Sequence, residues 1–288
     1  MPPSRRLAAV LPLCLIAAAS IAQLPRNGAN PVVSPQNSAT ISYADTADMV
    51  LAAPLLAIVT VDQSTALKGP QAAGVAPGLA RLFVEATVDT LVRGAGGISP
   101  KVSYLVDIPL DTANRTPKPP KLKKQRFLVL ARPVAGRPAE IMLVGPKAHI
   151  PWTPDAEARV RRVLAETLAP GAAPAITGIT SAFHVPGSLP GESETQIFLK
   201  TADSRPISLN VLRRPGERPR WAVSLTEMVD NSAAPPPRDT LLWYRLACGL
   251  PRLMPQTVVD SLQGADKAAA QADYQLVLAG LGACGRSR

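Results

Sequence analysis

Short apolar runs with the spacing of β-strands, separated by proline and glycine, recur through most of this sequence. In the run 81–89, Val84, Ala86 and Val88 alternate with polar residues, which is the two-residue period of a strand with one buried face. The chain contains 31 prolines, and proline breaks the interior of a helix. These features predict a fold whose main elements are short strands joined by tight turns.

Residues 45–150 are predicted to form a small barrel or sandwich, because five strand-like runs follow one another there. The runs are 55–61, 81–89, 101–110, 126–132 and 140–144. The apolar run 47–53 precedes them and is expected to open the same β-rich module.

The order of these runs, with 47–53 at the start and the apolar run 126–130 late, resembles the OB-type five-stranded barrels of netrin-like and inhibitor-like proteins. The resemblance covers about 100 residues and implies a barrel. As a whole, the sequence most resembles uncharacterised exported bacterial proteins, and that resemblance implies no activity.

Residues 151–234 are expected to begin with a helix that packs on a sheet. Thr153 can cap its N-terminus, Pro154 suits its first turn, and an apolar stripe starts at Val160. Its exposed side is expected to carry two ion pairs at i,i+4 spacing, Glu157–Arg161 and Arg162–Glu166.

Four more strand-like runs follow this helix. They are 176–185, 195–199, 207–212 and 221–225. Their connections are too short for the crossovers that parallel strands need, so a second, antiparallel sheet is predicted.

Residues 235–288 are predicted to form a helical hairpin after a stiff proline spacer. One helix begins near Leu241 and ends at Gly249, and the other covers about 265–281. Three small or apolar residues of the second helix are expected to face the first helix: Ala272, Leu276 and Ala279.

The N-terminus has the pattern of a secretory signal peptide. Arg5 and Arg6 precede the apolar run 7–16, and a small-x-Ala cleavage site ends at Ala22. The apolar run is too short to span a bilayer comfortably. We therefore expect residues 1–22 to be removed, residues 23–44 to form a flexible leader, and the mature chain to lack a transmembrane helix. An uncut N-terminal anchor is the alternative.

Removal of the signal peptide also changes the cysteine count and the charge. Cys14 is lost, and the remaining Cys248 and Cys284 are predicted to form a disulfide in an oxidising compartment. Arg5 and Arg6 are lost with no acid, so the net charge falls from +10 to +8. The fold class expected is α+β, with an N-terminal barrel or sandwich, a connecting helix, a second sheet and a disulfide-linked helical hairpin.

No catalytic or metal-binding motif is recognisable. The two histidines, His149 and His184, are interpreted as packed or strand-end residues, because G-x-S-x-G and H-E-x-x-H motifs are absent. We therefore expect no cofactor and no metal. Aromatic residues make up only 4% of the chain, which argues against a base-stacking platform and so against nucleic acid.

Six basic residues with no acid among them occur within 115–126, where three prolines stiffen the chain. They are Arg115, Lys118, Lys121, Lys123, Lys124 and Arg126. One interpretation is a solvated loop that keeps the protein soluble. The other is an electrostatic contact with an anionic surface.

The sequence thus favours an exported, non-enzymatic protein, periplasmic or secreted, that mediates interactions in the cell envelope. Its expected partners are anionic envelope lipid or polysaccharide, contacted through the basic loop, or another envelope protein. The alternative is a secreted hydrolase that uses His184, with Ser181 and an acid from elsewhere in the chain.

Overall fold

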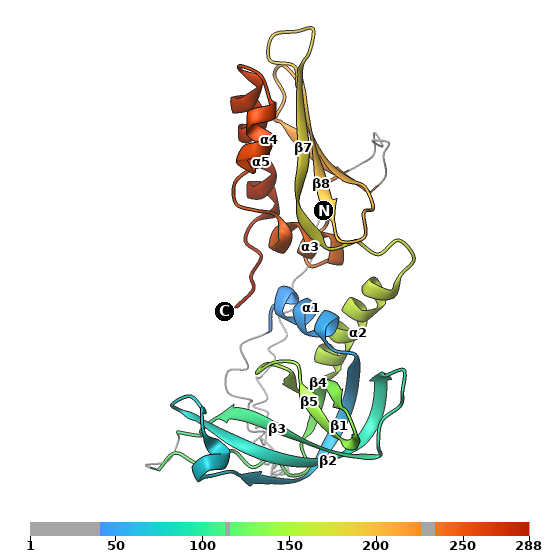
Figure 1. Ribbon diagram of the computed structural model, residues 1–288, viewed down its shortest axis with the longest axis vertical. Coiled ribbons are helices and arrows are strands. Elements are labelled where there is room, and N and C mark those ends of the chain that lie inside the picture. The colour runs from blue at the N-terminus through green and yellow to red at the C-terminus, as the bar shows by residue number, and fades with distance from the viewer. Residues whose placement is uncertain (1–40, 113–115, 226–233, 288) are drawn as a thin grey trace, which may run out of the picture. The chain divides into compact units, whose positions relative to one another are not determined.

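The computed structural model of this chain describes residues 41–112, 116–225 and 234–287 (Figure 1). The predicted signal peptide lies outside these ranges, as do the predicted leader up to residue 40 and Arg115 of the basic loop. No helix among the described residues is long and apolar enough to cross a membrane.

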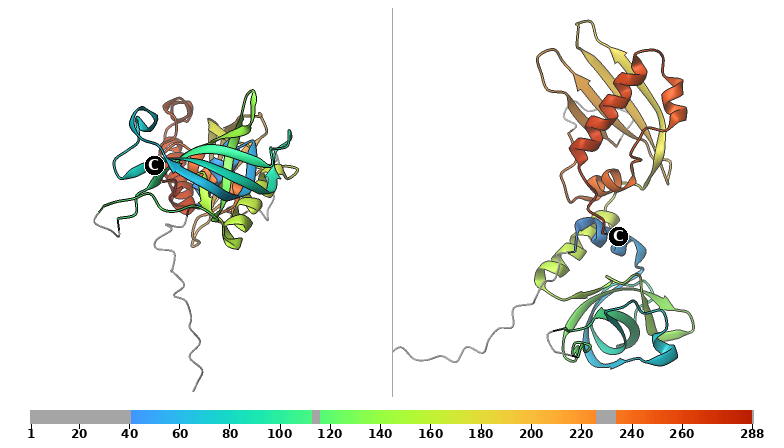
Figure 2. Two further views of the ribbon diagram at one scale, coloured as in Figure 1. Left: turned by 90° about the horizontal axis from the view of Figure 1, so that it is seen from below. Right: turned by 90° about the vertical axis from the view of Figure 1, so that its left-hand side faces the viewer.

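The N-terminal module is a closed, five-stranded mixed β-barrel (Figures 1 and 2). Its strands are β1 (Leu55–Ala66), β2 (Leu79–Arg93), β3 (Lys101–Pro109), β4 (Arg126–Val134) and β5 (Arg137–Leu143). The order around the ring is β1-β2-β3-β5-β4, and β4 pairs back to β1. Only the β3–β5 pairing is parallel. The predicted barrel is confirmed, and a short strand β6 (His149–Pro151) extends the sheet beside β4.

Both faces of β1 are buried, which explains why its sequence is continuously apolar rather than alternating. Leu55, Ala57 and Val59 belong to the core inside the barrel. Leu56 and Ile58 belong to a second core, together with residues of helices α1 (Tyr43–Ala52) and α2 (Pro154–Leu168).

The structure corrects the prediction that the run 47–53 is part of the β texture, because α1 covers most of it. The side chain of Ser42 accepts a hydrogen bond from the Asp45 backbone N–H at 3.0 Å and caps the helix. Tyr43, Ala47 and Val50 are buried at the spacing of one helix face. The helix also includes Tyr43 and the following alanine, which the prediction assigned to the leader 23–44.

Helix α2 forms as predicted, with Thr153 as its N-cap and the Glu157–Arg161 ion pair at 2.7 Å. The other predicted ion pair, between Arg162 and Glu166, is wrong. Glu166 instead accepts hydrogen bonds from the Tyr43 hydroxyl and from the backbone N–H of Leu241, each at 2.6 Å. These bonds join α2 to α1 and to the start of the C-terminal helices.

The second sheet is antiparallel, as predicted, and its strands lie in the order β10-β9-β8-β7. Its strands are β7 (Ile176–Pro186), β8 (Ser193–Thr201), β9 (Ile207–Arg213) and β10 (Arg220–Ser224). The C-terminal helices follow: α3 (Leu241–Gly249), α4 (Gln256–Ser261) and α5 (Asp266–Leu281). Figure 2 shows α5 lying along one face of this sheet.

The predicted disulfide between Cys248 and Cys284 is present and links α3 to the end of α5. The predicted contact face of α5 is wrong for Ala272 and Ala279, which are exposed, whereas Leu276 is partly buried and packs against the core. The buried residues of α5 are instead Ala270, Asp273, Tyr274, Val277 and Leu281. An aspartate within this buried face needs polar partners, which the second sheet supplies.

Candidate functional site

The basic loop between β3 and β4 is anchored to the barrel at several points. Leu122 lies in the barrel core and is 5% exposed. The backbone N–H of Lys124 donates to the Val61 carbonyl at 2.8 Å, and the Val61 N–H donates to the Gln125 carbonyl at 2.9 Å. Asp111 and Lys118 form an antiparallel bridge at the base of the loop. These contacts fix the backbone that carries the basic side chains.

Four of the six predicted basic residues are exposed and make no ion pair with any described carboxylate: Lys118, Lys121, Lys123 and Lys124. Lys124 also has a left-handed backbone, with φ of 69°. Arg126 differs, because it is paired with Asp89 at 3.0 Å and stacks over the ring of Trp152 at 4.0 Å. The anchored loop therefore presents four lysines whose charges no carboxylate among the described residues neutralises.

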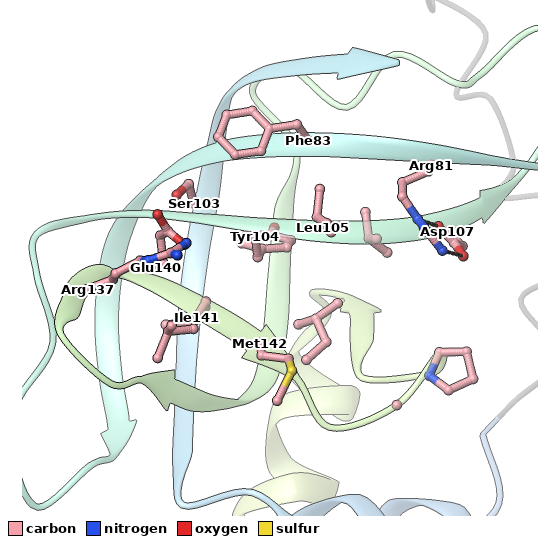
Figure 3. A pocket seen from close by; sticks show the side chains of 15 residues that line it. Arg81, Phe83, Ser103, Tyr104, Leu105, Asp107, Arg137, Glu140, Ile141 and Met142 are labelled. Atoms are coloured by element: carbon pink, nitrogen blue, oxygen red, sulfur yellow. Dashed lines mark hydrogen bonds and ion pairs between the residues drawn. The ribbon is translucent and has the colours of Figure 1, made fainter. Parts of the chain in front are cut away.

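A groove on the outer face of the barrel, between β3 and β5, is a second candidate (Figure 3). Its volume is about 660 Å³, within the range of ligand pockets. Three large apolar side chains line it and remain partly exposed: Phe83, Leu105 and Met142. Phe83 lies opposite Leu105 in the β2–β3 register, so the two side chains share one face of the barrel.

Two ion pairs border this groove (Figure 3). Arg81 and Asp107 form a bidentate pair, with both nitrogen–oxygen distances at 2.8 Å. Arg137 and Glu140 pair at 2.9 Å. Each pair is neutral as a whole, so the groove itself offers apolar surface rather than net charge.

The sequence prediction missed this groove, although one signal for it is present. In the run 81–89, the buried positions are even-numbered, which places the aromatic Phe83 on the polar, outward phase of the strand. A single exposed aromatic residue is normal on a protein surface, so this signal gains meaning only when the fold brings Leu105 and Met142 beside Phe83.

His149 packs beside the barrel core rather than opening to solvent. Its ring stacks on Phe127 with the centroids 3.8 Å apart, and its Nε2 is hydrogen-bonded to the Tyr104 hydroxyl at 3.0 Å. Burial lowers the pKa of His149 to about 4, so the ring is neutral near pH 7. The structure thus places His149 as a packed residue at the start of β6.

His184 lies in a network that joins the second sheet to α5. Its Nδ1 is hydrogen-bonded to the Thr195 hydroxyl at 2.8 Å, and that hydroxyl donates to the Asp273 carboxylate at 2.5 Å. Arg213 pairs with the same carboxylate, with its Nε donating at 2.7 Å. Thr195 and Asp273 are both 0% exposed. Among the described residues, His184 has no hydrogen bond to Ser181.

This network differs from a nucleophile–base pair. The proton of the Thr195 hydroxyl is directed to Asp273, so His184 is the donor toward that oxygen. A buried hydroxyl in this arrangement fixes the position of a helix, whereas a catalytic nucleophile must reach a substrate.

A scan against models of known protein families finds no match for this chain, and a search of curated proteins finds none either. Among the described residues, no group of His, Cys, Asp or Glu side chains is arranged to hold a metal ion.

Proposed function

We propose that this chain is an exported, non-enzymatic protein of the cell envelope, and that its basic loop contacts anionic surfaces. The observation that carries this proposal is the set of four exposed lysines on an anchored loop, none of which forms an ion pair within the part of the chain that the structure describes. We further propose that the barrel is of the OB type. The strand order β1-β2-β3-β5-β4 supports this class, as does the closed ring of five strands.

Export is supported by two independent features. The N-terminal residues follow the signal-peptide pattern, with Arg5 and Arg6 before a short apolar run. The Cys248–Cys284 disulfide is of the kind that persists in oxidising compartments such as the periplasm or the cell exterior.

The proposed contact is electrostatic and long-range rather than shape-specific. Lysine ammonium groups act as point charges, and each contributes roughly 1 kcal/mol near an anionic lipid surface. Four lysines on one loop thus supply about 4 kcal/mol before the cost of association. Because the Debye length is about 8 Å at physiological ionic strength, this attraction must weaken steeply as salt is added.

The test is co-sedimentation of the purified chain with phosphatidylglycerol vesicles and with phosphatidylcholine vesicles at low and high salt. A quadruple variant replaces Lys118, Lys121, Lys123 and Lys124 with Gln. A matched control variant replaces four exposed basic residues outside the barrel with Gln: Lys200 on β8, Arg214 and Arg218 between β9 and β10, and Arg252 between α3 and α4.

We expect binding to anionic vesicles only, a loss of at least tenfold in the loop variant, and little change in the control variant. An acidic polysaccharide such as alginate, used as a soluble competitor, separates a lipid headgroup from a polysaccharide as the source of the anion. Equal losses in the two variants, or binding that high salt does not weaken, would refute the loop as the contact site.

The hydrolase alternative predicts ester or peptide hydrolysis that is abolished by His184→Ala. The hydroxyl that His184 contacts belongs to Thr195, which is fully buried, so a substrate would have to reach His184 from another side.

A further inference from the structure

The pairing that closes the barrel between β3 and β5 is short. The two strands share only one register pair, Ser103 with Glu140. By contrast, β3 pairs with β2 along its whole length. Among the described residues, no strand pairs with the β5-facing edge of β3 beyond Ser103. The groove of Figure 3 lies along this opening.

The alternation of backbone hydrogen bonds shows which groups of β3 face the opening. Val88 N–H donates to the Pro100 carbonyl, and Leu110 N–H donates to the Gly78 carbonyl, so even-numbered residues of this strand direct their backbone polar groups toward β2. Leu105 and Asp107 therefore direct their N–H and C=O groups toward the groove. An open strand edge of this kind is a template for pairing with another extended chain.

The side chains around this edge add an apolar surface. Phe83 is 37% exposed, Leu105 49% and Met142 57%. Their positions on β2, β3 and β5 place them on neighbouring strands around one groove (Figure 3). Such clustering of large apolar side chains marks an interaction surface, whereas single exposed ones are normal on any protein.

The positive charge of the basic loop beside the groove favours a ligand with an acidic end. Past Asp107, β3 leads within four residues, or about 13 Å, to the bridge between Asp111 and Lys118. The unpaired lysines of the basic loop therefore begin beyond the Asp107 end of the groove. A ligand that is apolar in the groove and acidic at this end complements both surfaces.

We propose that this opening binds an extended, alternately apolar peptide segment of a partner protein, with acidic residues at the end nearest Lys118. The binding of the apolar part of the peptide is inferred from the groove alone. Only the acidic residues at the end of the peptide rest on the proposed function of the basic loop. An extended peptide supplies hydrogen-bond partners for the Leu105 and Asp107 backbone, as in β-strand addition. An acyl chain would cover those polar groups without pairing them, at a cost of about 1–3 kcal/mol for each.

The test measures the binding of a fluorescent peptide of alternating valine and threonine that ends in glutamates. A second version of the peptide carries N-methyl groups on alternate backbone amides and cannot pair with a strand edge. The variant Leu105→Pro removes the N–H that faces the groove but leaves the β2–β3 hydrogen bonds in place. The matched variant Leu105→Val keeps that N–H, and circular dichroism checks that both variants are folded.

We expect the parent peptide to bind, and N-methylation or Leu105→Pro to weaken binding at least tenfold, while Leu105→Val retains it. The quadruple lysine variant should weaken binding several-fold and remove most of its salt dependence. The inference is overturned by absence of binding at millimolar peptide, by equal binding of the N-methylated peptide, or by palmitate as the preferred ligand.

The two proposals fail separately in these measurements. Leu105→Pro should bind anionic vesicles as the unmodified chain does, because the lysines are untouched. Loss of peptide binding with intact vesicle binding identifies the groove, whereas vesicle binding that survives in the lysine variant refutes only the proposed function of the loop.

Discussion

Asp273 should be the most stabilising single polar residue of the C-terminal helices. Its side chain is fully buried, accepts from Thr195 and pairs with Arg213. Replacing it with alanine leaves the Thr195 hydroxyl and the Arg213 guanidinium without their shared partner. Breaking a buried ion pair in this way costs about 3–5 kcal/mol. Because the Arg213 side chain is 35% exposed and water can reach it, we expect a loss near the lower end, about 3 kcal/mol.

The assay is urea unfolding of the purified, oxidised chain, followed by circular dichroism at pH 7. Asp266→Ala removes an acid from the first turn of the same helix and is the matched control, with an expected cost below about 1 kcal/mol. Asp273→Asn replaces the carboxylate with an amide, which keeps one oxygen acceptor and adds a donor. Its loss of unfolding free energy should lie between the losses of Asp273→Ala and Asp266→Ala. A cost below about 1 kcal/mol for Asp273→Ala would refute the claim that this carboxylate holds α5 on the sheet.

Two further predictions concern His149 and the disulfide. Burial lowers the pKa of His149 in the folded chain from 6.5 to about 4. As the pH falls, the unfolded chain therefore binds a proton at this histidine before the folded chain does. The contribution of the neutral ring to the unfolding free energy is fully present above about pH 6.5, and about 3 kcal/mol is lost as the pH approaches 4. Urea unfolding between pH 7 and 4.5 should therefore show a steeper loss for the unmodified chain than for His149→Gln, and parallel losses would contradict this account. Replacing Cys248 and Cys284 together with alanine should lower the unfolding free energy by about 4 kcal/mol, because the disulfide spans 36 residues. A change below about 1 kcal/mol in the same assay would show that the bond adds little.

Local signals were sufficient to predict much of the fold. The second sheet follows from short alternating runs between turn residues, and α2 follows from Thr153, Pro154 and its apolar stripe. Helix α1 was mispredicted because the run 47–53 is apolar enough to fit either a strand or a packed helix. The Ser42 cap with Asp45 three residues later was the local signal that favoured the helix.

Long-range partners account for the remaining errors. The buried face of α5 could not be predicted from its own sequence, because the polar partners of the buried Asp273 are Thr195 and Arg213, which lie 78 and 60 residues earlier. Glu166 bonds to Tyr43 and Leu241, again far away in the chain. In both cases a charged residue that local spacing assigns to the exposed side contacts another element.

The same limit applies to the candidate sites. Composition was enough to find the basic loop, and the structure shows four of its lysines exposed. Composition alone could not show that Arg126 is paired with Asp89, which lies 37 residues earlier. The groove depends on the parallel contact between β3 and β5, and that register is not readable from either strand alone.

The salt dependence of vesicle binding tests the central claim most directly. For the unmodified chain, affinity for phosphatidylglycerol vesicles should fall steeply between low and physiological salt. The variant that replaces Lys118, Lys121, Lys123 and Lys124 with Gln should bind weakly and with little dependence on salt. Equal affinity and equal salt dependence for the two proteins would contradict the proposed role of the basic loop.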